Sequence, residues 1–261
     1  MKKIDSVVII GSGNLAESLA QAIAESGISL VQIFARNKER GAEVARLAST
    51  FSTDSPQELA HADLYIAALS DRAVEGVMSS LPFPKGAIVA HTAGSVPIDA
   101  LPASLGGRAV IYPFQTFTKG RKVDFINIPI LLETSTPELF EVVVEFAKQL
   151  TSTTIVADSS MRQKVHLAGV FACNFANYMY SLGESVVAQA GLGFEILKPL
   201  LLETAAKAAA AQSPSQVQTG PAIRNDEQVQ QRHIEMLPVG GDITELYKLI
   251  SKNIWETSKK I

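Results

Sequence analysis

Cysteine and histidine are scarce in this chain of 261 residues, which has one cysteine and four histidines. A single cysteine cannot form an internal disulfide, and a cysteine-rich zinc site is excluded. Hydrophobic runs are also short, because none approaches the roughly 20 apolar residues that a membrane-spanning helix needs. The formal net charge of −3 provides no basic field for nucleic acid.

The first residues contain a weak likeness to a secretion signal. Two lysines at positions 2 and 3 precede the apolar run 7–10. The run is too short for a signal peptide, and it leads into Gly11-Ser12-Gly13 rather than a cleavage site. We therefore expect a cytoplasmic protein that binds a small-molecule substrate and has no metal, nucleic-acid partner or membrane anchor.

Short apolar runs alternate with amphipathic segments up to about residue 154. Such alternation is typical of βαβ units and predicts an α/β domain with a mainly parallel sheet. The predicted strands are 6–10, 30–34, 63–69, 87–90, 108–112, 128–132 and 153–156, with predicted helices at 14–26, 38–48 and 137–150.

The second part of the chain is predicted to be all-helical, because no strand pattern follows residue 158. The composition shift near residue 155 divides the chain into predicted domains 1–156 and 157–261. We expect the second domain to hold substrate and to form a homodimer, although a buried core explains the same apolar residues. Its predicted helices are 160–190, 194–212, 226–236 and 243–258, with a loop at 213–225.

A glycine motif joins the first predicted strand to the first predicted helix. It reads Gly11-Ser12-Gly13-Asn14-Leu15-Ala16, the pattern G-x-G-x-x-A. The first glycine permits a tight turn, the second lets the backbone approach a pyrophosphate, and the helix N-terminus attracts phosphate. With a strand before it and a helix after it, this motif predicts a doubly wound Rossmann domain that binds a dinucleotide.

The turn after the second predicted strand indicates which dinucleotide is bound. An NAD-selective domain carries an acidic residue there, whereas this chain has Ala35, Arg36 and Asn37, with Lys38 and Arg40 close by. A guanidinium pairs with a 2′-phosphate, which a carboxylate would repel. We therefore expect NADP as the cofactor, although these cations can also simply solvate the start of a helix.

Three further strand ends carry polar residues. Because ligands bind beyond the carboxyl ends of strands in open α/β sheets, we expect a nicotinamide and substrate cleft at this edge. The competing interpretations are a helix cap, a polar turn and an aromatic core contact. The residues assigned to the cofactor are Leu69, Ser70, His91, Thr92 and Ala93, with Ser95 as a candidate proton donor and Gln115 as a substrate contact.

The long predicted helix carries polar residues among apolar ones. His166, Gly169, Cys173 and Asn177 share a face, and Asn174 lies close to it. His166 is our candidate general acid and Asn174 a catalytic partner, although a buried histidine bonded to a carbonyl is the competing interpretation. We interpret Cys173 as a buried packing residue.

A loop in the helical part supplies the second candidate contact to substrate. Arg224 can clamp a substrate carboxylate or phosphate. The same residues can instead form the start of a helix, with Asn225 or Asp226 as its N-cap.

These residues resemble a known group of enzymes. The segment Gly11–Ala16 followed by Phe34–Asn37 is similar to the N-terminal domain of pyrroline-5-carboxylate reductases and coenzyme-F420-dependent NADP oxidoreductases. The segments His166–Phe175 and Thr219–Arg224 resemble the domain-of-unknown-function 2520 family. This resemblance implies a helical domain of the 6-phosphogluconate-dehydrogenase type, often dimeric, and an NADP oxidoreductase without a fixed substrate.

The chain also differs from relatives of this group in the long helix. Related β-hydroxyacid dehydrogenases carry a catalytic lysine followed one helical turn later by asparagine, whereas here Lys164 is followed by Ala168. We therefore expect hydride transfer between NADP(H) and a small carbonyl, imine or hydroxy compound in an interdomain cleft, with His166 in place of the lysine. The alternatives are a non-catalytic NADP(H)-binding sensor or scaffold and, less favoured, a deazaflavin that works beside NADP.

Overall fold

The computed structural model describes residues 3–238 and 241–260. Contacts divide the chain into two compact units, residues 1–177 and 178–261. This division lies later than the composition shift near residue 155, because the helix that follows the last strand still contacts the sheet. The predicted domain boundary after residue 156 stays a prediction.

Unit 1 is built on one eight-stranded sheet with the order β3-β2-β1-β4-β5-β6-β7-β8. Every neighbouring pair is parallel except β6 and β7, which confirms the mainly parallel sheet. The connection from β6 to β7 contains one short helical turn and no α-helix that could cross the sheet, and β7 runs antiparallel to β6. The strands are β1 (Ser6–Ile10), β2 (Ser29–Phe34), β3 (Phe51–Thr53), β4 (Leu64–Ala67), β5 (Ile88–His91), β6 (Gly107–Pro113), β7 (Ile130–Thr134) and β8 (Thr154–Val156).

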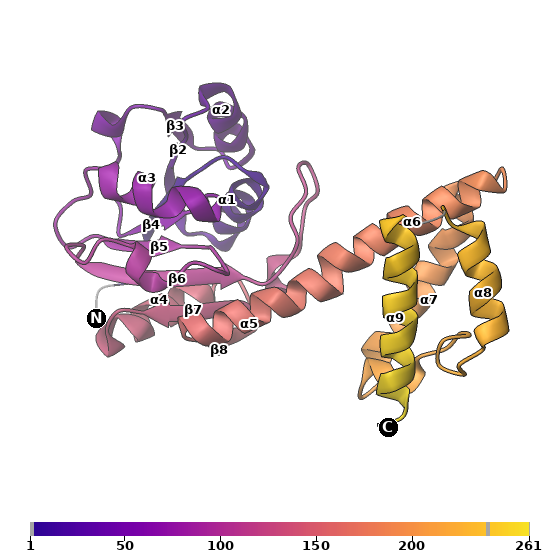
Figure 1. Cartoon of the computed structure of the whole chain (residues 1–261). Coiled ribbons are helices and arrows are strands. Elements are labelled where there is room, and N and C mark those ends of the chain that lie inside the picture. The colour runs from indigo at the N-terminus through magenta and orange to yellow at the C-terminus, as the bar shows by residue number, and fades with distance from the viewer. Residues whose placement is uncertain (1–2, 239–240, 261) are drawn as a thin grey trace. The chain divides into compact units, whose positions relative to one another are not determined.

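The helices of unit 1 begin and end at residues that favour such ends. Gly13 precedes the first helix, and Gly27 follows it in the left-handed region at φ 84°. The side chain of Asn37 caps the second helix by accepting from the Arg40 N–H. Figure 1 shows these helices around the sheet: α1 (Asn14–Ser26), α2 (Lys38–Leu47), α3 (Val74–Ser80), α4 (Pro137–Ala147) and α5 (Ser159–Gly169).

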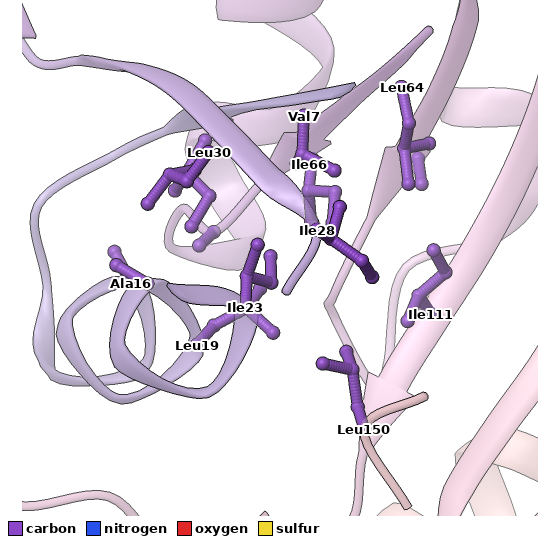
Figure 2. Close-up of a cluster of buried hydrophobic side chains, with 14 of the residues drawn as sticks. Val7, Ala16, Leu19, Ile23, Ile28, Leu30, Leu64, Ile66, Ile111 and Leu150 are labelled. Carbon is purple, nitrogen blue, oxygen red and sulfur yellow. The ribbon is translucent and has the colours of Figure 1, made fainter. Parts of the chain in front are cut away.

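The main core cluster lies between the sheet and its covering helices. Leu19 and Ile23 of α1 pack with Val7 of β1 and Ile66 of β4, and all four side chains are fully buried. Figure 2 shows α1 with its apolar side chains directed at the strands. A parallel sheet covered on both faces needs continuous apolar strands, and β1 and β4 have this pattern. The core therefore fixes the carboxyl ends of β1 and β4 beside each other.

The described residues of unit 2 form helices and loops without a strand. Helix α6 (Ala176–Gln189) runs from the end of unit 1 into unit 2 and is followed by α7 (Lys198–Ala210), α8 (Glu227–Met236) and α9 (Asp242–Ser258). This confirms the all-helical second part. Among the described residues, no helix is both long and apolar enough to cross a membrane.

Candidate active site

The glycine loop between β1 and α1 forms an open cradle. Gly11 has φ +125°, and a Cβ there would lie 2.2 Å from the Ala68 carbonyl oxygen, so only glycine suits this turn. At Gly13, in contrast, a Cβ would meet nothing within 4 Å. Gly13 also provides no side-chain cap for α1. No side chain caps the first N–H groups of α1, and such uncapped groups suit the pyrophosphate of a dinucleotide.

Arg40 supports this loop from α2. Its Nε donates to the Ser12 carbonyl at 3.1 Å, and its guanidinium pairs with the carboxylates of Glu17 and Glu43. Glu17 in turn accepts from the Gly120 N–H at 2.9 Å. The sequence analysis grouped Arg40 with the cations near a 2′-phosphate. In the structure its guanidinium is paired with Glu17 and Glu43 instead.

Arg36 is the cation at the end of β2 that remains available. Its side chain is exposed, and no ion pair between described residues includes it. The preceding Ala35 is buried, so no acidic side chain stands at this turn. Asn37 lies beside Arg36, but its side-chain oxygen accepts from the Arg40 N–H at 3.0 Å. A phosphate at this turn would thus meet one free guanidinium.

The loop after β5 is organised by a buried histidine. His91 is fully buried, its Nδ1 accepts from the Ala93 N–H at 3.2 Å, and its Nε2 lies 3.3 Å from the Pro97 carbonyl. Burial lowers the pKa of His91 to about 4, and the charge of Arg162 adds to this effect. The ring is therefore neutral at physiological pH, with its proton on Nε2.

The other predicted cofactor residues of these strand ends lie at the same edge of the sheet. Thr92 is buried and donates to the Ala67 carbonyl at 3.1 Å. Leu69 is half-buried and Ser70 is exposed just after β4. The carboxyl ends of β1, β4 and β5 are neighbours in the sheet, so these residues and the glycine loop share one edge.

Ser95, a predicted proton donor, is exposed and its hydroxyl donates to the Asp71 carboxylate. Its carbonyl accepts from Gln163 Nε2 at 3.1 Å, which connects the loop after β5 to α5. The hydroxyl proton of Ser95 is therefore held by Asp71.

His166 meets the sheet edge on α5. Its Nδ1 lies 3.0 Å from the Tyr112 hydroxyl at the end of β6. A Cβ on Gly94 would lie 2.6 Å from His166 Nδ1 and 2.8 Å from Tyr112 Cζ. The absence of a side chain at Gly94 therefore makes room for the rings of His166 and Tyr112. The bond between Tyr112 and His166 joins two segments far apart in the chain, and the sequence does not predict it.

A cavity of about 350 Å³ opens beside His166 within unit 1. It brings together His166, Asn174 and Gln115, three of the predicted site residues, whereas Ser95 does not line it. Cys173 also lines it and is exposed, so its interpretation as a buried packing residue is wrong. The lining residues are Tyr112, Phe114, Gln115, Thr116, His166, Gly169, Val170, Ala172, Cys173 and Asn174.

The helix wall of this cavity contains a π-helical turn at Val170–Phe175, which follows α5 directly. Such turns insert one residue into a helix and are frequent at functional sites. Here the turn includes both Cys173 and Asn174, which line the cavity.

Arg162 holds the start of α5 on the sheet. Its side chain is fully buried, forms an ion pair with Glu133 at the end of β7 and donates to the Val96 carbonyl. Ser159 Oγ lies 3.2 Å from the guanidinium and 3.0 Å from a Glu133 oxygen. Because Arg162 lies four residues before His166, this anchor is one helical turn from the cavity.

Arg224, the second predicted substrate residue, belongs to unit 2. It is exposed in a turn that precedes α8. The side chain of Asp226 caps that helix by accepting from the Val229 N–H at 3.1 Å. The N-cap interpretation of this segment is thus confirmed for Asp226.

Two family models match separate parts of the chain. Residues 6–94 match the family described as NADP oxidoreductase coenzyme F420-dependent. Residues 128–254 match the family described as Domain of unknown function (DUF2520). A comparison with curated proteins gives no match.

Solved structures resemble the chain over nearly its whole length. The structure of a "putative NADP oxidoreductase" from Bacteroides fragilis is 37% identical, with a TM-score of 0.89, over 97% of this chain and 98% of the other. A 1-pyrroline-5-carboxylate reductase from Streptococcus pyogenes is 16% identical, with a TM-score of 0.62, over 98% of both chains. An imine reductase from Myxococcus stipitatus in complex with NADP⁺ is 13% identical, with a TM-score of 0.62, over 98% of this chain and 93% of the other. The last two show the fold alone.

Proposed function

Because the chain belongs to the NADP oxidoreductase family that the Bacteroides fragilis protein represents, we propose that it transfers hydride between NADP(H) and a small carbonyl, imine or hydroxy compound. One observation carries the proposal. The open glycine cradle and the cavity that contains His166 both lie at the carboxyl edge of the same sheet. A cofactor that crosses this edge brings a redox group toward a side chain able to move a proton.

The cofactor would be held by residues from three strand ends. The backbone of Gly11, Ser12, Gly13, Asn14 and Leu15 would bind the pyrophosphate, and Arg36 would bind the 2′-phosphate beside Ala35 and Asn37. Leu69, Ser70, His91, Thr92 and Ala93 would border the nicotinamide half. The bound nicotinamide supplies or accepts the hydride, and the protein fixes where it lies.

The substrate would occupy the cavity beside His166. No aspartate, glutamate, lysine or arginine lines this cavity, so we expect the part of the substrate held there to be uncharged. His166 would exchange a proton with the substrate oxygen or nitrogen, and the amides of Gln115 and Asn174 would orient that group by hydrogen bonds.

Replacing Arg36 by Ala is expected to weaken NADPH binding about tenfold to a hundredfold and to leave NADH binding unchanged. The reason is that a hydrogen bond to a charged group contributes about 1.5–3 kcal/mol, and NADH lacks the 2′-phosphate. Titration with each cofactor, followed by nicotinamide fluorescence, measures both affinities. Arg46→Ala at the far end of α2 is the control and should change neither. Equal affinity of the unmodified protein for both cofactors would refute the selectivity.

We further propose that unit 2 associates with a second copy of the chain. Only three of its described residues, Ala222, Thr244 and Ser251, are buried, although a stable helix normally buries an apolar stripe. A second copy would cover the apolar side chains that unit 2 exposes. These include Val186, Leu192, Ile196, Leu200, Leu202, Met236 and Leu249.

Light scattering at micromolar concentration should therefore give the mass of two chains. Association through such apolar side chains should persist in high salt, which screens charges but not apolar contacts. The mass of a single chain over the whole concentration range would contradict the proposal.

A further inference from the structure

We propose that Tyr112 is the positioning residue for His166, and that its phenol oxygen accepts the Nδ1–H so that Nε2 is the ring nitrogen that exchanges a proton with substrate. The inference rests on the proposed function and deepens it. It starts from the 3.0 Å contact between the Tyr112 hydroxyl and His166 Nδ1. At a neutral imidazole, the bond made by one nitrogen decides which nitrogen carries the proton.

Packing fixes which edge of the His166 ring is covered. Gly94 lies against the Nδ1 and Cγ atoms, and any side chain there would collide with them. Tyr112 covers the same edge, and the two ring centroids are 6.1 Å apart at an interplanar angle of 63°. Among the described residues no hydrogen bond engages Nε2, while His166 lines the cavity. Nε2 is thus the nitrogen left for a ligand.

The charges around Tyr112 favour its oxygen as the acceptor. Burial and, after it, the Asp71 carboxylate raise the pKa of the Tyr112 phenol against the opposite effect of the Arg162 charge, so the hydroxyl keeps its hydrogen at physiological pH. The negative charge of Asp71 attracts this hydrogen. An oxygen lone pair is then directed to Nδ1–H, as a phenol can donate and accept at the same time. The Asp71 carboxylate accepts a hydrogen bond from the hydroxyl of Ser95.

With the Nδ1–H bonded to Tyr112, each proton in the transfer has a defined donor and acceptor. In the reducing direction the imidazolium gives its Nε2 proton to the substrate oxygen or nitrogen while hydride reaches the adjacent carbon from the nicotinamide. The ring becomes neutral and keeps Nδ1–H on Tyr112, and a solvent proton later restores Nε2–H. The phenol bond is unchanged throughout. If Tyr112 donated to Nδ1 instead, loss of the Nε2 proton would leave an imidazolate, which is far too basic to form.

The test reads the histidine tautomer directly and needs no substrate. In protein labelled with ¹⁵N at histidine, spectra at a pH where the ring is neutral should show His166 protonated at Nδ1. Tyr112→Phe should return it to the Nε2–H form that free histidine favours. Four histidines are present, and His166→Ala assigns the signal. An Nε2–H form in the unmodified protein, or no change in Tyr112→Phe, would overturn the proposal.

Unit 2 offers a matched control. There His233 Nδ1 lies 2.8 Å from the Tyr247 hydroxyl, with ring centroids 5.9 Å apart. Tyr247→Phe should alter the ¹⁵N signals of His233 and leave turnover unchanged. Tyr112→Phe should lower kcat about tenfold with KM and NADPH affinity nearly constant, because only the proton-donating nitrogen is misplaced.

Kinetics separate this inference from the proposed function. If His166→Ala retains full turnover while the tautomer result is as expected, the proton role of His166 is wrong, although the Tyr112 bond exists. If His166→Ala is inactive and Tyr112→Phe has normal kcat, Tyr112 is not a positioning residue.

Discussion

Replacing Arg162 by Met is expected to lower the free energy of unfolding by about 3–5 kcal/mol, the usual cost of removing one partner from a buried ion pair. The Glu133 carboxylate would lose its charged partner, and the Val96 carbonyl would lose a donor. The Arg162 side chain is fully buried and the Glu133 side chain is 16% exposed, so little water reaches the pair. Urea unfolding followed by circular dichroism measures the difference.

Two further variants decide how this loss arises. Glu133→Gln combined with Arg162→Met removes both charges, so it should recover part of the stability that the single change loses. Lys148→Met breaks an exposed pair with Glu145 and should leave the urea midpoint unchanged. If Arg162→Met also unfolds at the original midpoint, the buried pair does not anchor α5.

Replacing His166 by Ala is expected to reduce kcat at least about a hundredfold, the scale of general acid–base help. The substrate is first found by following NADPH oxidation with a panel of small uncharged ketones, aldehydes and cyclic imines. NADPH affinity should stay constant, because the imidazole lies beside the substrate cavity and the glycine loop is untouched. A loss confined to kcat identifies an interaction made in the transition state.

His61→Ala is the control for this substitution, because His61 is exposed before β4. It should retain full turnover. Normal turnover in His166→Ala would remove the imidazole from the chemistry. If the unmodified protein binds NADPH tightly and oxidises it with no compound of the panel, the NADP(H) sensor becomes the better interpretation.

The long elements of the fold are predictable because their sequence signals are local. Helix α1 begins and ends as predicted, since glycines stand on both sides of an amphipathic segment. Strand β3 was missed because it has three residues and exposes Phe51. Helix α3 was missed because seven residues give too few apolar positions for a helical period. The π-helical turn was missed because the apolar pattern around it does not mark an inserted residue.

The candidate site was predictable where one segment contains the whole signal. The glycine motif and the Ala35-Arg36-Asn37 turn are of this kind. Contacts between distant segments were not predictable, and the bond from Tyr112 to His166 spans 54 positions. For the same reason Arg40 was placed with the phosphate-binding cations, although Glu17 holds it. The role of such a side chain depends on which distant residue it contacts, and the sequence alone does not show that contact.

The buried ring of His91 makes the cofactor edge of the sheet sensitive to acid. The folded chain resists protonation of this ring down to a pKa of about 4, whereas the unfolded chain takes up the proton near the ordinary value of 6.5. Unfolding therefore absorbs a proton between these values. The stability that His91 contributes is complete above pH 6.5 and falls by up to about 1.4 kcal/mol per pH unit below it. Mild acidification would thus destabilise the chain through a residue of the loop after β5, which borders the proposed nicotinamide site.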